Sequence, residues 1–168
     1  EGTRKNRGWK IPSPMIDVLM NFPYFHRYFK IKFLDYKENY YKKIFSQVEA
    51  VSGCFFLMKS SIIERMGYFN ENVFLFYEEN ILGSKVKQLN LRILVSNKIK
   101  VSHRHSVSIN KSVKKINKYK VLKKSQAYFQ KNYNHANIIE QALLFITNKI
   151  TLIILYVVYF IENIIVKE

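Results

Sequence analysis

Residues 51–103 read VSGCFFLMKSSIIERMGYFNENVFLFYEENILGSKVKQLNLRILVSNKIKVSH, and short apolar runs in this stretch alternate with turn-forming residues. The run over 48–59 is rich in β-branched and aromatic residues around a glycine, which is typical of a buried strand. The next segment predicts a short helix over 61–66, because it opens on the spacing of a capping box (SIIE) and Gly67 suits the left-handed position at a helix end. A strand followed by a helix indicates an α/β unit.

A second helix is expected to begin at Glu78, directly after the aromatic run FLFY. Its apolar positions recur at helical spacing, and Asn90 marks its end after about three turns. Two short apolar stretches follow, and we expect them to form edge strands over 91–95 and 99–101.

The flanking segments predict a loop and several helices. Residues 1–14 are polar and contain two prolines, which indicates a surface loop. Residues 15–45 mix aromatic with basic residues and predict one or two short helices interrupted at Pro23. Residues 111–134 predict a strongly basic helix, and residues 138–166 form the most apolar segment of the chain.

The composition indicates one folded domain, or half of a larger one. The chain has 168 residues, of which 48% are apolar and 15% aromatic, so it can bury a core and is neither disordered nor collagen-like. The single cysteine, Cys54, excludes an intramolecular disulfide and fits a reducing cytoplasm. The first residue is Glu1 and no apolar signal segment follows it, so we expect a fragment or a processed piece.

Positive charge dominates the chain, with 28 Lys and Arg against 12 Asp and Glu and a net charge of +16. Such a field attracts nucleic acid, anionic lipid or phosphorylated ligands, although codon composition could also produce a Lys-rich chain. No Asp or Glu occurs between Asn80 and Ile139, whereas fourteen Lys and Arg lie between Lys85 and Lys131. The helix over 111–134 carries a loose apolar stripe and is therefore interpreted as a membrane-surface helix, with a solvated face as the alternative.

The C-terminal apolar segment is long enough to span a membrane, but a charged residue interrupts it. Residues 141–161 would just cross a bilayer, yet Lys149 falls near the middle, and the uncharged run over 150–161 is too short by itself. We expect this segment to lie in the membrane interface or to pair with another subunit. A transmembrane helix is the alternative.

Two side-chain groups are candidates for chemistry. Glu78 and Glu79 begin the second helix and point roughly 100° apart, so they have different surroundings. Glu79 shares the spacing of the apolar face and is expected to point inward, where the helix dipole favours its ionised form, as a general base requires. The alternative is that both carboxylates only complement the dipole. His103 and His105 form an HxH pair that suits a metal clamp on a strand, or they are surface histidines.

The stretch from Val51 to His103 resembles, without a gap, the acceptor half of the family-two glycosyltransferases of the GT-A fold, especially the bacterial rhamnosyltransferase-like members. The resemblance covers about a third of the chain. The ordered motifs that carry it are Ser52-Gly53, Gly67-Tyr68-Phe69-Asn70-Glu71, Glu78-Glu79-Asn80-Ile81-Leu82 and His103.

This resemblance implies an inverting transferase that moves a sugar from a nucleotide-sugar donor to a lipid-linked or cell-surface polysaccharide acceptor. Glu79 then occupies the position of the catalytic base, with Glu78 beside it. Gly53 and the aromatic residues Phe74 and Tyr77 would line the acceptor side, and His103 matches a position that helps to bind the divalent metal, Mg or Mn, on the diphosphate.

The sequence also departs from the pattern of that family. The base is usually Asp, and the longer Glu79 changes the position of the carboxylate; Asn70 and Ile81 replace two acidic residues, and Lys85 replaces an Arg. The nucleotide-binding half and its Asp-x-Asp metal motif have no counterpart, so the metal site is incomplete and the chain is expected to be inactive alone.

The expected architecture is therefore α/β, a partial GT-A fold with C-terminal basic and apolar helices. Residues 1–110 would form the acceptor-side part and residues 111–168 a membrane-associating extension at the inner face of the cell membrane. The alternative is a non-catalytic basic remnant that binds membrane or nucleic acid, but no nucleic-acid fold signature occurs, so no nucleic acid is expected as a partner.

Overall fold

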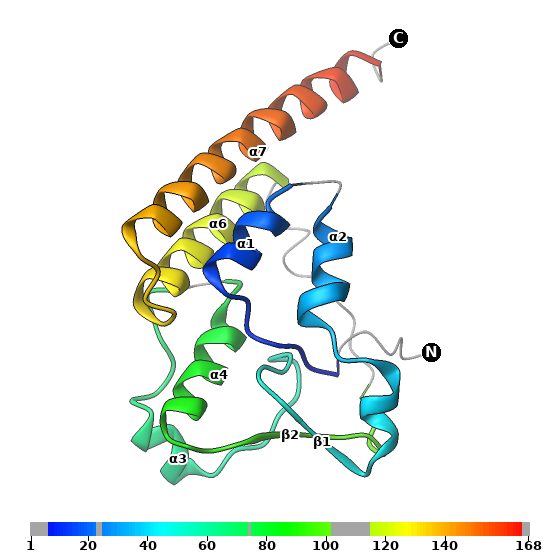
Figure 1. Cartoon of the computed structure of the whole chain (residues 1–168), viewed down its shortest axis with the longest axis vertical. Coiled ribbons are helices and arrows are strands. Elements are labelled where there is room, and N and C mark those ends of the chain that lie inside the picture. Colours follow the sequence, from blue (N-terminus) through cyan, green and yellow to red (C-terminus); the bar gives the residue numbers. More distant parts are fainter. Residues whose placement is uncertain (1–6, 23–24, 74, 102–114, 166–168) are drawn as a thin grey trace.

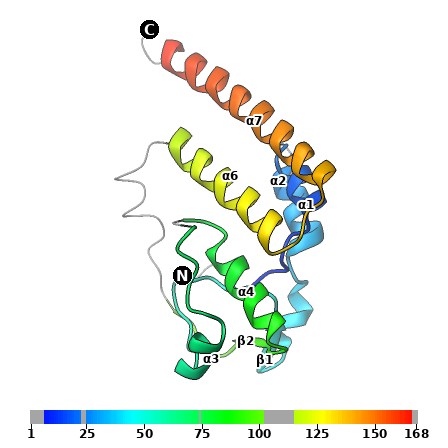
Figure 2. The ribbon, with the colours of Figure 1, turned by 90° about the vertical axis from the view of Figure 1, so that its left-hand side faces the viewer.

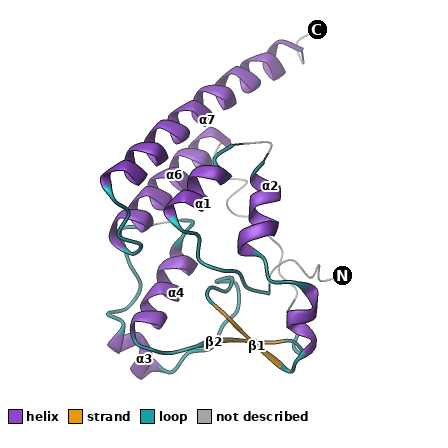
Figure 3. Cartoon of the chain, viewed as in Figure 1, coloured by secondary structure: helices purple, strands orange, loops and turns teal. Residues whose placement is uncertain are grey.

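The computed structural model describes residues 7–22, 25–73, 75–101 and 115–165, and it combines helices with a small two-stranded sheet (Figure 3). The expected α/β architecture is thus confirmed only as a mixture of helices and strands. The elements in chain order are α1 (Pro14–Met20), α2 (His26–Phe29), the π-helix η2 (Lys30–Leu34), the 3-10 helix η3 (Glu38–Lys42), β1 (Phe45–Val48), α3 (Ser60–Arg65), α4 (Glu78–Gln88), β2 (Ile93–Ser96), α6 (Lys115–Asn132) and α7 (Ile138–Ile165).

The sheet pairs two segments that are almost fifty residues apart. β1 and β2 are antiparallel, with Phe45 opposite Ser96 and Val48 opposite Ile93. The predicted strand over 91–95 is therefore confirmed in part, but no strand forms over 99–101.

The expected strand over 48–59 is wrong. β1 ends at Val48, and Ala50 then exchanges two backbone hydrogen bonds of 3.0 Å with Trp9. The chain turns after Val51, so Gly53 lies in an exposed turn rather than in a strand. Residues 45–50 therefore pair with β2 and with Trp9, and residues 51–59 form a loop.

The two predicted helices on either side of the aromatic run are confirmed. α3 ends at Arg65 with Met66 as its C-cap, and Gly67 follows with a φ of +66°, the left-handed conformation that glycine adopts without strain. The capping box is wrong, because Lys59 is the N-cap of α3 and no side chain caps it. α4 begins at Glu78 as expected and ends just before Asn90.

Residues 15–45 form short helical pieces, but these are α1, α2, η2 and η3 rather than the one or two helices expected, and Pro23 lies outside the described residues. α6 and α7 lie side by side and run in opposite directions, with α1 packed against α7 (Figures 1 and 2). α4 lies below α6, and the sheet lies at the far end of the molecule (Figure 1). α7 continues well beyond its neighbours.

Within the part of the chain that the structure describes, one helix segment, Ile138–Ile161 of α7, is long and apolar enough to cross a membrane. Only 17% of this window is buried inside the protein. Most of its surface is therefore not buried by the residues that the structure describes.

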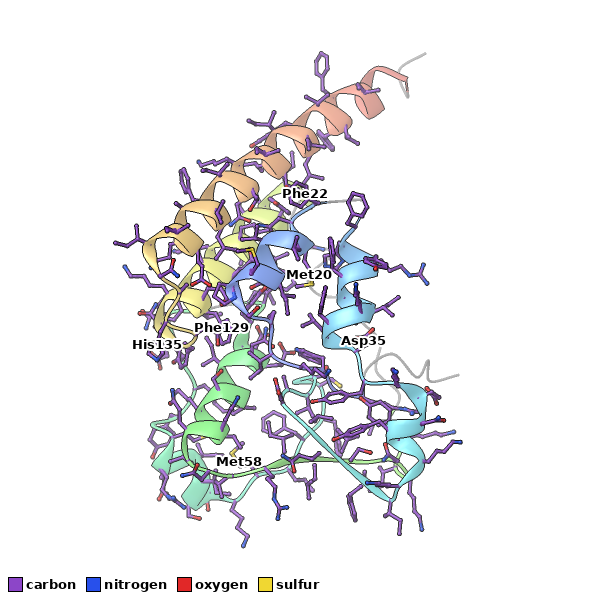
Figure 4. All side chains as sticks on the ribbon, in the orientation of Figure 1. Met20, Phe22, Asp35, Met58, Phe129 and His135 are labelled. Carbon is purple, nitrogen blue, oxygen red and sulfur yellow. The ribbon has the colours of Figure 1, made fainter. Side chains whose placement is uncertain are left out.

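α4 divides the hydrophobic core into two clusters. Leu82 and Val86 pack with Met66 on the side of the sheet. Ile81 packs with Val73 and with Phe129 of α6, whose ring lies at the centre of the molecule (Figure 4). Both sides of α4 are thus buried, and its orientation is fixed by the two halves of the structure.

Gly83 brings α4 into direct contact with the segment that follows β1. A Cβ atom at this position would lie 2.2 Å from the carbonyl oxygen of Glu49 and 3.1 Å from Cδ1 of Ile11. Nearby, Nε1 of Trp9 donates a 2.8 Å hydrogen bond to Oδ1 of Asn80. The close approach therefore depends on the absence of a side chain at Gly83.

We expect Gly83→Ala to lower the free energy of unfolding by about 1–3 kcal/mol, because the backbone of Glu49 must move to admit the methyl group. The higher helix propensity of alanine offsets only about 1 kcal/mol of this loss. Urea denaturation measures the difference. Gln88→Ala, an exposed change in the same helix, is the control and should be nearly neutral; equal stability of the two variants would contradict the close packing.

Candidate functional site

The carboxylate pair follows two residues with unusual backbone conformations. Phe76 and Tyr77 both have a φ of +64°, in the left-handed region that bulky residues rarely adopt. Each such residue costs of order 1 kcal/mol or more, and such strain is typical of functional sites. Tyr77 is the N-cap of α4, so this turn sets the direction in which Glu78 and Glu79 leave the backbone.

Glu79 points toward the loop that contains Gly53. Its Oε1 accepts a hydrogen bond of 3.2 Å from the backbone N–H of Gly53. The side chain is half-buried, so it is neither in bulk solvent nor sealed in the core. The carboxylate lies in the first turn of α4, where the helix dipole stabilises negative charge by about 0.3–1 kcal/mol.

Glu78 points to different surroundings. It lies at the edge of a hollow of about 240 Å³, which is lined by Met66, Tyr68, Phe69, Asn70, Val73, Glu78, Ile81, Leu82 and Lys85. Partial burial, and secondarily the charge of Glu79, raise the pKa of Glu78 above its usual value. The two neighbouring carboxylates are therefore separated by orientation, as expected for adjacent residues on a helix.

A buried carboxylate binds the left-handed turn at Phe76 and Tyr77 through the Tyr77 hydroxyl. Asp17 of α1 is fully buried, and its Oδ1 accepts a 2.6 Å hydrogen bond from the hydroxyl of Tyr77. Its Oδ2 accepts a 2.5 Å hydrogen bond from Nε2 of Gln130 in α6. Nε2 of Gln126 also donates to the hydroxyl of Tyr77, at 3.2 Å. Tyr77 is therefore bound to α1 and α6 together.

The same polar cluster extends to α7 through Asn21, which is the C-cap of α1. Nζ of Lys123 donates hydrogen bonds to Oδ1 of Asn21 and, at 3.2 Å, to Oε1 of Gln126. Nδ2 of Asn21 donates to Oγ1 of Thr147 at 2.8 Å, and Oγ1 of Thr151 donates to the carbonyl oxygen of Asn21 at 2.7 Å. The cluster thus joins all three helices to the turn before α4.

Burial changes the titration of this cluster. It raises the pKa of Asp17 from 3.8 to about 6, although the hydrogen bonds from Tyr77 and Gln130 oppose the shift. It lowers the pKa of Lys123 from 10.5 to about 8, against the attraction of Asp17. Burial and the nearby Asp17 also raise the pKa of Tyr77 well above its usual value, so its hydroxyl remains a proton donor.

The structure separates the predicted site residues into three groups. Glu79 and Gly53 come together, although Gly53 lies in a turn. The ring centre of Tyr77 lies 5.5 Å from that of Phe129, and its hydroxyl donates a hydrogen bond to Asp17. Phe74 and the histidine pair, His103 and His105, lie outside the described residues.

The metal implied by the resemblance has no set of ligands in the described ranges. No group of three His, Cys, Asp or Glu side chains gathers there within reach of one ion.

Sequence reasoning missed the buried polar cluster. One signal was present: Asp17 is the only acidic residue between Glu1 and Asp35, and it lies within the apolar helix PMIDVLM. A lone acid on an apolar helix requires buried partners. Its partner Gln130 is 113 residues away, so the sequence did not show which side chains these would be.

Comparison of the chain with family models, with curated proteins and with solved structures gives no match. The likeness to glycosyltransferases therefore rests on the motifs in residues 51–103 and remains a hypothesis.

We expect Asp17→Asn to weaken the dependence of stability on pH. Because the pKa of Asp17 is higher in the folded than in the unfolded chain, the folded state binds more protons between about pH 4 and pH 6. The contribution of this carboxyl to stability is thus complete below about pH 4 and falls as the pH rises to about 6. Asparagine does not titrate, so the free energy of unfolding of the variant should fall less across this window.

Urea denaturation at a series of pH values measures this slope. Asp35→Asn is the control for the loss of one carboxylate, because Asp35 is partly exposed in an ion pair with Lys30. Identical slopes for Asp17→Asn and the wild-type chain would show that Asp17 does not hold its proton as the burial indicates.

Proposed function

We propose that this chain is the acceptor-side part of an inverting glycosyltransferase of the family-two, GT-A type, with Glu79 as the general base. The observation that supports this most directly is the left-handed turn at Phe76 and Tyr77, which precedes a half-buried carboxylate facing the Gly53 loop. A purely structural pair at a helix start needs no such strained turn. The reaction type is what the resemblance of the ordered motifs in residues 51–103 to that family implies.

In the proposed reaction, one oxygen of the Glu79 carboxylate takes the proton of an acceptor hydroxyl. The hydroxyl oxygen attacks the anomeric carbon of the donor sugar from the face opposite the leaving group and forms the new C–O bond. The bond between that carbon and the nucleoside diphosphate breaks, and the leaving group takes the electron pair. The configuration at the anomeric carbon is thereby inverted.

The turn and the Gly53 loop would position this base. The N–H of Gly53 holds one carboxylate oxygen, which leaves the other free for the acceptor hydroxyl. The donor nucleotide would bind to a part that has no counterpart in this sequence, and a divalent metal on its diphosphate would neutralise the leaving group. We therefore propose that the chain transfers sugar only together with such a donor-binding part.

We expect Glu79→Gln, in a protein that joins this chain to its donor-binding part, to reduce sugar transfer by about a hundredfold to ten-thousandfold, the usual contribution of a general base. Glutamine has nearly the same shape but cannot accept the proton. Binding of the nucleotide sugar, measured by calorimetry, should persist, because the base acts on the acceptor.

Glu78→Gln is the matched control, since it removes a charge from the neighbouring residue, whose side chain faces the hollow instead of Gly53. Its effect on transfer should be much smaller. Undiminished turnover of Glu79→Gln would remove this residue from the mechanism.

We also propose that the chain lies at a membrane, where a lipid-linked acceptor would be found. The exposed apolar surface of α7 and the acid-free basic stretch of Lys85 to Lys131 support this placement. Each lysine near anionic lipid adds about 1 kcal/mol of attraction. The same features suit a non-catalytic basic protein that binds membrane, which is the second candidate function.

We expect the chain to co-sediment with vesicles that contain phosphatidylglycerol, and salt should weaken this binding. Vesicles of phosphatidylcholine alone should bind less, because they lack the anionic attraction. A salt-dependent mobility shift with single-stranded RNA, without binding to vesicles, would favour a nucleic-acid partner instead and would contradict the membrane placement.

A further inference from the structure

A short helical segment at the edge of the molecule has two different faces. α2 runs directly into η2, so residues 26–34 form one continuous helical segment. One face contains Leu34, which is buried, and the stacked rings of Phe29 and Phe33, which are partly buried. α2 packs against α1 and stands at the edge of the described part of the molecule (Figure 1). The segment is thus attached to the body through one face and exposed on the other.

The exposed face of this segment carries large apolar side chains. Phe25, Tyr28 and Ile31 are 56–57% exposed and lie three residues apart, so they point to the same side of the helix. Phe22, 44% exposed at the end of α1, adjoins them, because its carbonyl oxygen accepts the backbone N–H groups of Phe25 and His26 (Figure 4). Single exposed apolar residues are common on protein surfaces, but a continuous row of them indicates an interaction site.

Two cations lie beside this apolar row. Nζ of Lys32 donates a 3.3 Å hydrogen bond to the hydroxyl oxygen of Tyr28 and lies 5.5 Å from the centre of the Tyr28 ring. Arg27 is exposed in α2. Apolar and aromatic side chains bordered by cations are typical of protein surfaces that lie in the headgroup region of anionic membranes.

No acidic side chain of this segment opposes these cations. The sequence has no Asp or Glu between Asp17, which is buried, and Asp35. Asp35 and Glu38 follow the segment, and both lie in ion pairs, with Lys30 at 2.6 Å and with Arg7 at 3.3 Å. The segment is therefore complementary in charge to an anionic surface.

The exposed apolar row and its two cations form what we call the α2 surface: Phe22, Phe25, Arg27, Tyr28, Ile31 and Lys32. We propose that the α2 surface docks the chain on an anionic lipid bilayer. Its apolar side chains enter the headgroup region, and its cations meet the lipid phosphates. This inference rests on the proposed membrane placement and adds a contact surface that hydropathy does not select, since hydropathy selects α7.

A bilayer suits the α2 surface better than a folded partner or a nucleic acid does. Lipid headgroups move apart around a convex row of side chains, whereas a protein partner needs a complementary groove. Ile31 has no ring to stack on a base, unlike the side chains that bind single-stranded nucleic acid. Because α1 packs against both α2 and α7, docking through the α2 surface also fixes the position of α7 relative to the lipid.

Removing apolar side chains from the α2 surface tests the proposal. The full chain is mixed with vesicles of phosphatidylcholine and phosphatidylglycerol in equal parts, and the bound fraction is measured by co-sedimentation. Phe25→Ser combined with Ile31→Ser should reduce the partition into these vesicles by about tenfold, because two large apolar side chains no longer enter the headgroup region.

The sheet supplies a matched control. Phe45→Ser combined with Leu94→Ser removes a similar pair of side chains, each 56% exposed, from the strands β1 and β2 at the other end of the molecule (Figure 1). This control should change the partition by less than about twofold. Urea denaturation shows whether both variants remain folded. Losses of equal size in the two variants would overturn the proposal.

Removing the cations provides a second test. Arg27→Gln combined with Lys32→Gln should reduce the partition by about tenfold at low salt and should make it less dependent on salt. Lys42→Gln combined with Lys43→Gln removes the same charge from exposed positions in and after η3, and its effect should be much smaller. Equal effects would show that net charge alone drives the binding and would overturn the proposal.

A fluorescent label reports the contact directly and does not depend on the affinity of a variant. In a Cys54→Ser background, Tyr28→Cys and Phe45→Cys each carry an environment-sensitive fluorophore. Vesicles should shift the emission at 28 to the blue, and lipids with a quencher at the headgroup should quench it. The label at 45 should stay in water.

The outcomes separate this proposal from the proposals on which it rests. Co-sedimentation with an unchanged label at 28 would overturn the role of the α2 surface and would leave the membrane placement to another surface of the chain. No co-sedimentation would overturn the membrane placement as well, while the role of Glu79 is tested separately. Binding of single-stranded RNA that depends on Arg27 and Lys32, with no vesicle contact at 28, would assign the surface to nucleic acid and would also overturn the proposal.

Discussion

The buried carboxylate of Asp17 is the constraint that most of the structure depends on. A fully buried acid is stable only when its oxygens accept hydrogen bonds, and Asp17 takes them from Tyr77 and Gln130, which belong to the turn before α4 and to α6. One turn later, Nδ2 of Asn21 donates a hydrogen bond to Oγ1 of Thr147 in α7. An acid of this kind tolerates few alternative packings, because each one leaves a buried donor or acceptor without a partner. The helices therefore meet in one register.

Two sets of contacts position the candidate base, Glu79. The first is the hydrogen bond between Asp17 and Tyr77, and the second is the close backbone packing at Gly83. Tyr77 is held through its hydroxyl, and α4, which begins immediately after it, is held against the Glu49 backbone at Gly83 and against Trp9 through Asn80. The direction of Glu79 is thus determined by residues that do not touch it. A carboxylate on a helix that is held at its start and at its middle loses little further conformational entropy when it meets a substrate.

The sequence predicted the elements that depend on local signals. α4 follows from its apolar spacing, and the end of α3 follows from the left-handed preference of Gly67. The strand expected around Gly53 does not form. Composition indicates that residues suit a sheet, but it does not show which segment pairs with them. β2 and Trp9 pair with residues 45–50 instead, and no partner strand reaches Gly53 within the described residues. The resemblance placed Glu79 and Gly53 at one site, and the structure brings them together. The Asp17 cluster was not expected, because its hydrogen-bonded partners are up to 130 residues apart in the sequence.

α7 shows why composition also fails to give the surroundings of a helix. Its two halves are similarly apolar, yet Thr147 and Thr151 attach the first half to α1, whereas no residue of the second half up to Ile161 is buried by the described part of the chain. If a bilayer holds the second half, the first half fixes α1 relative to the membrane, α1 holds Tyr77 through Asp17, and Tyr77 sets the start of α4. The membrane and Glu79 would then be joined by a continuous series of buried contacts. A base positioned in this way would meet acceptor hydroxyls at a constant height above the lipid surface, which is what a lipid-linked substrate requires.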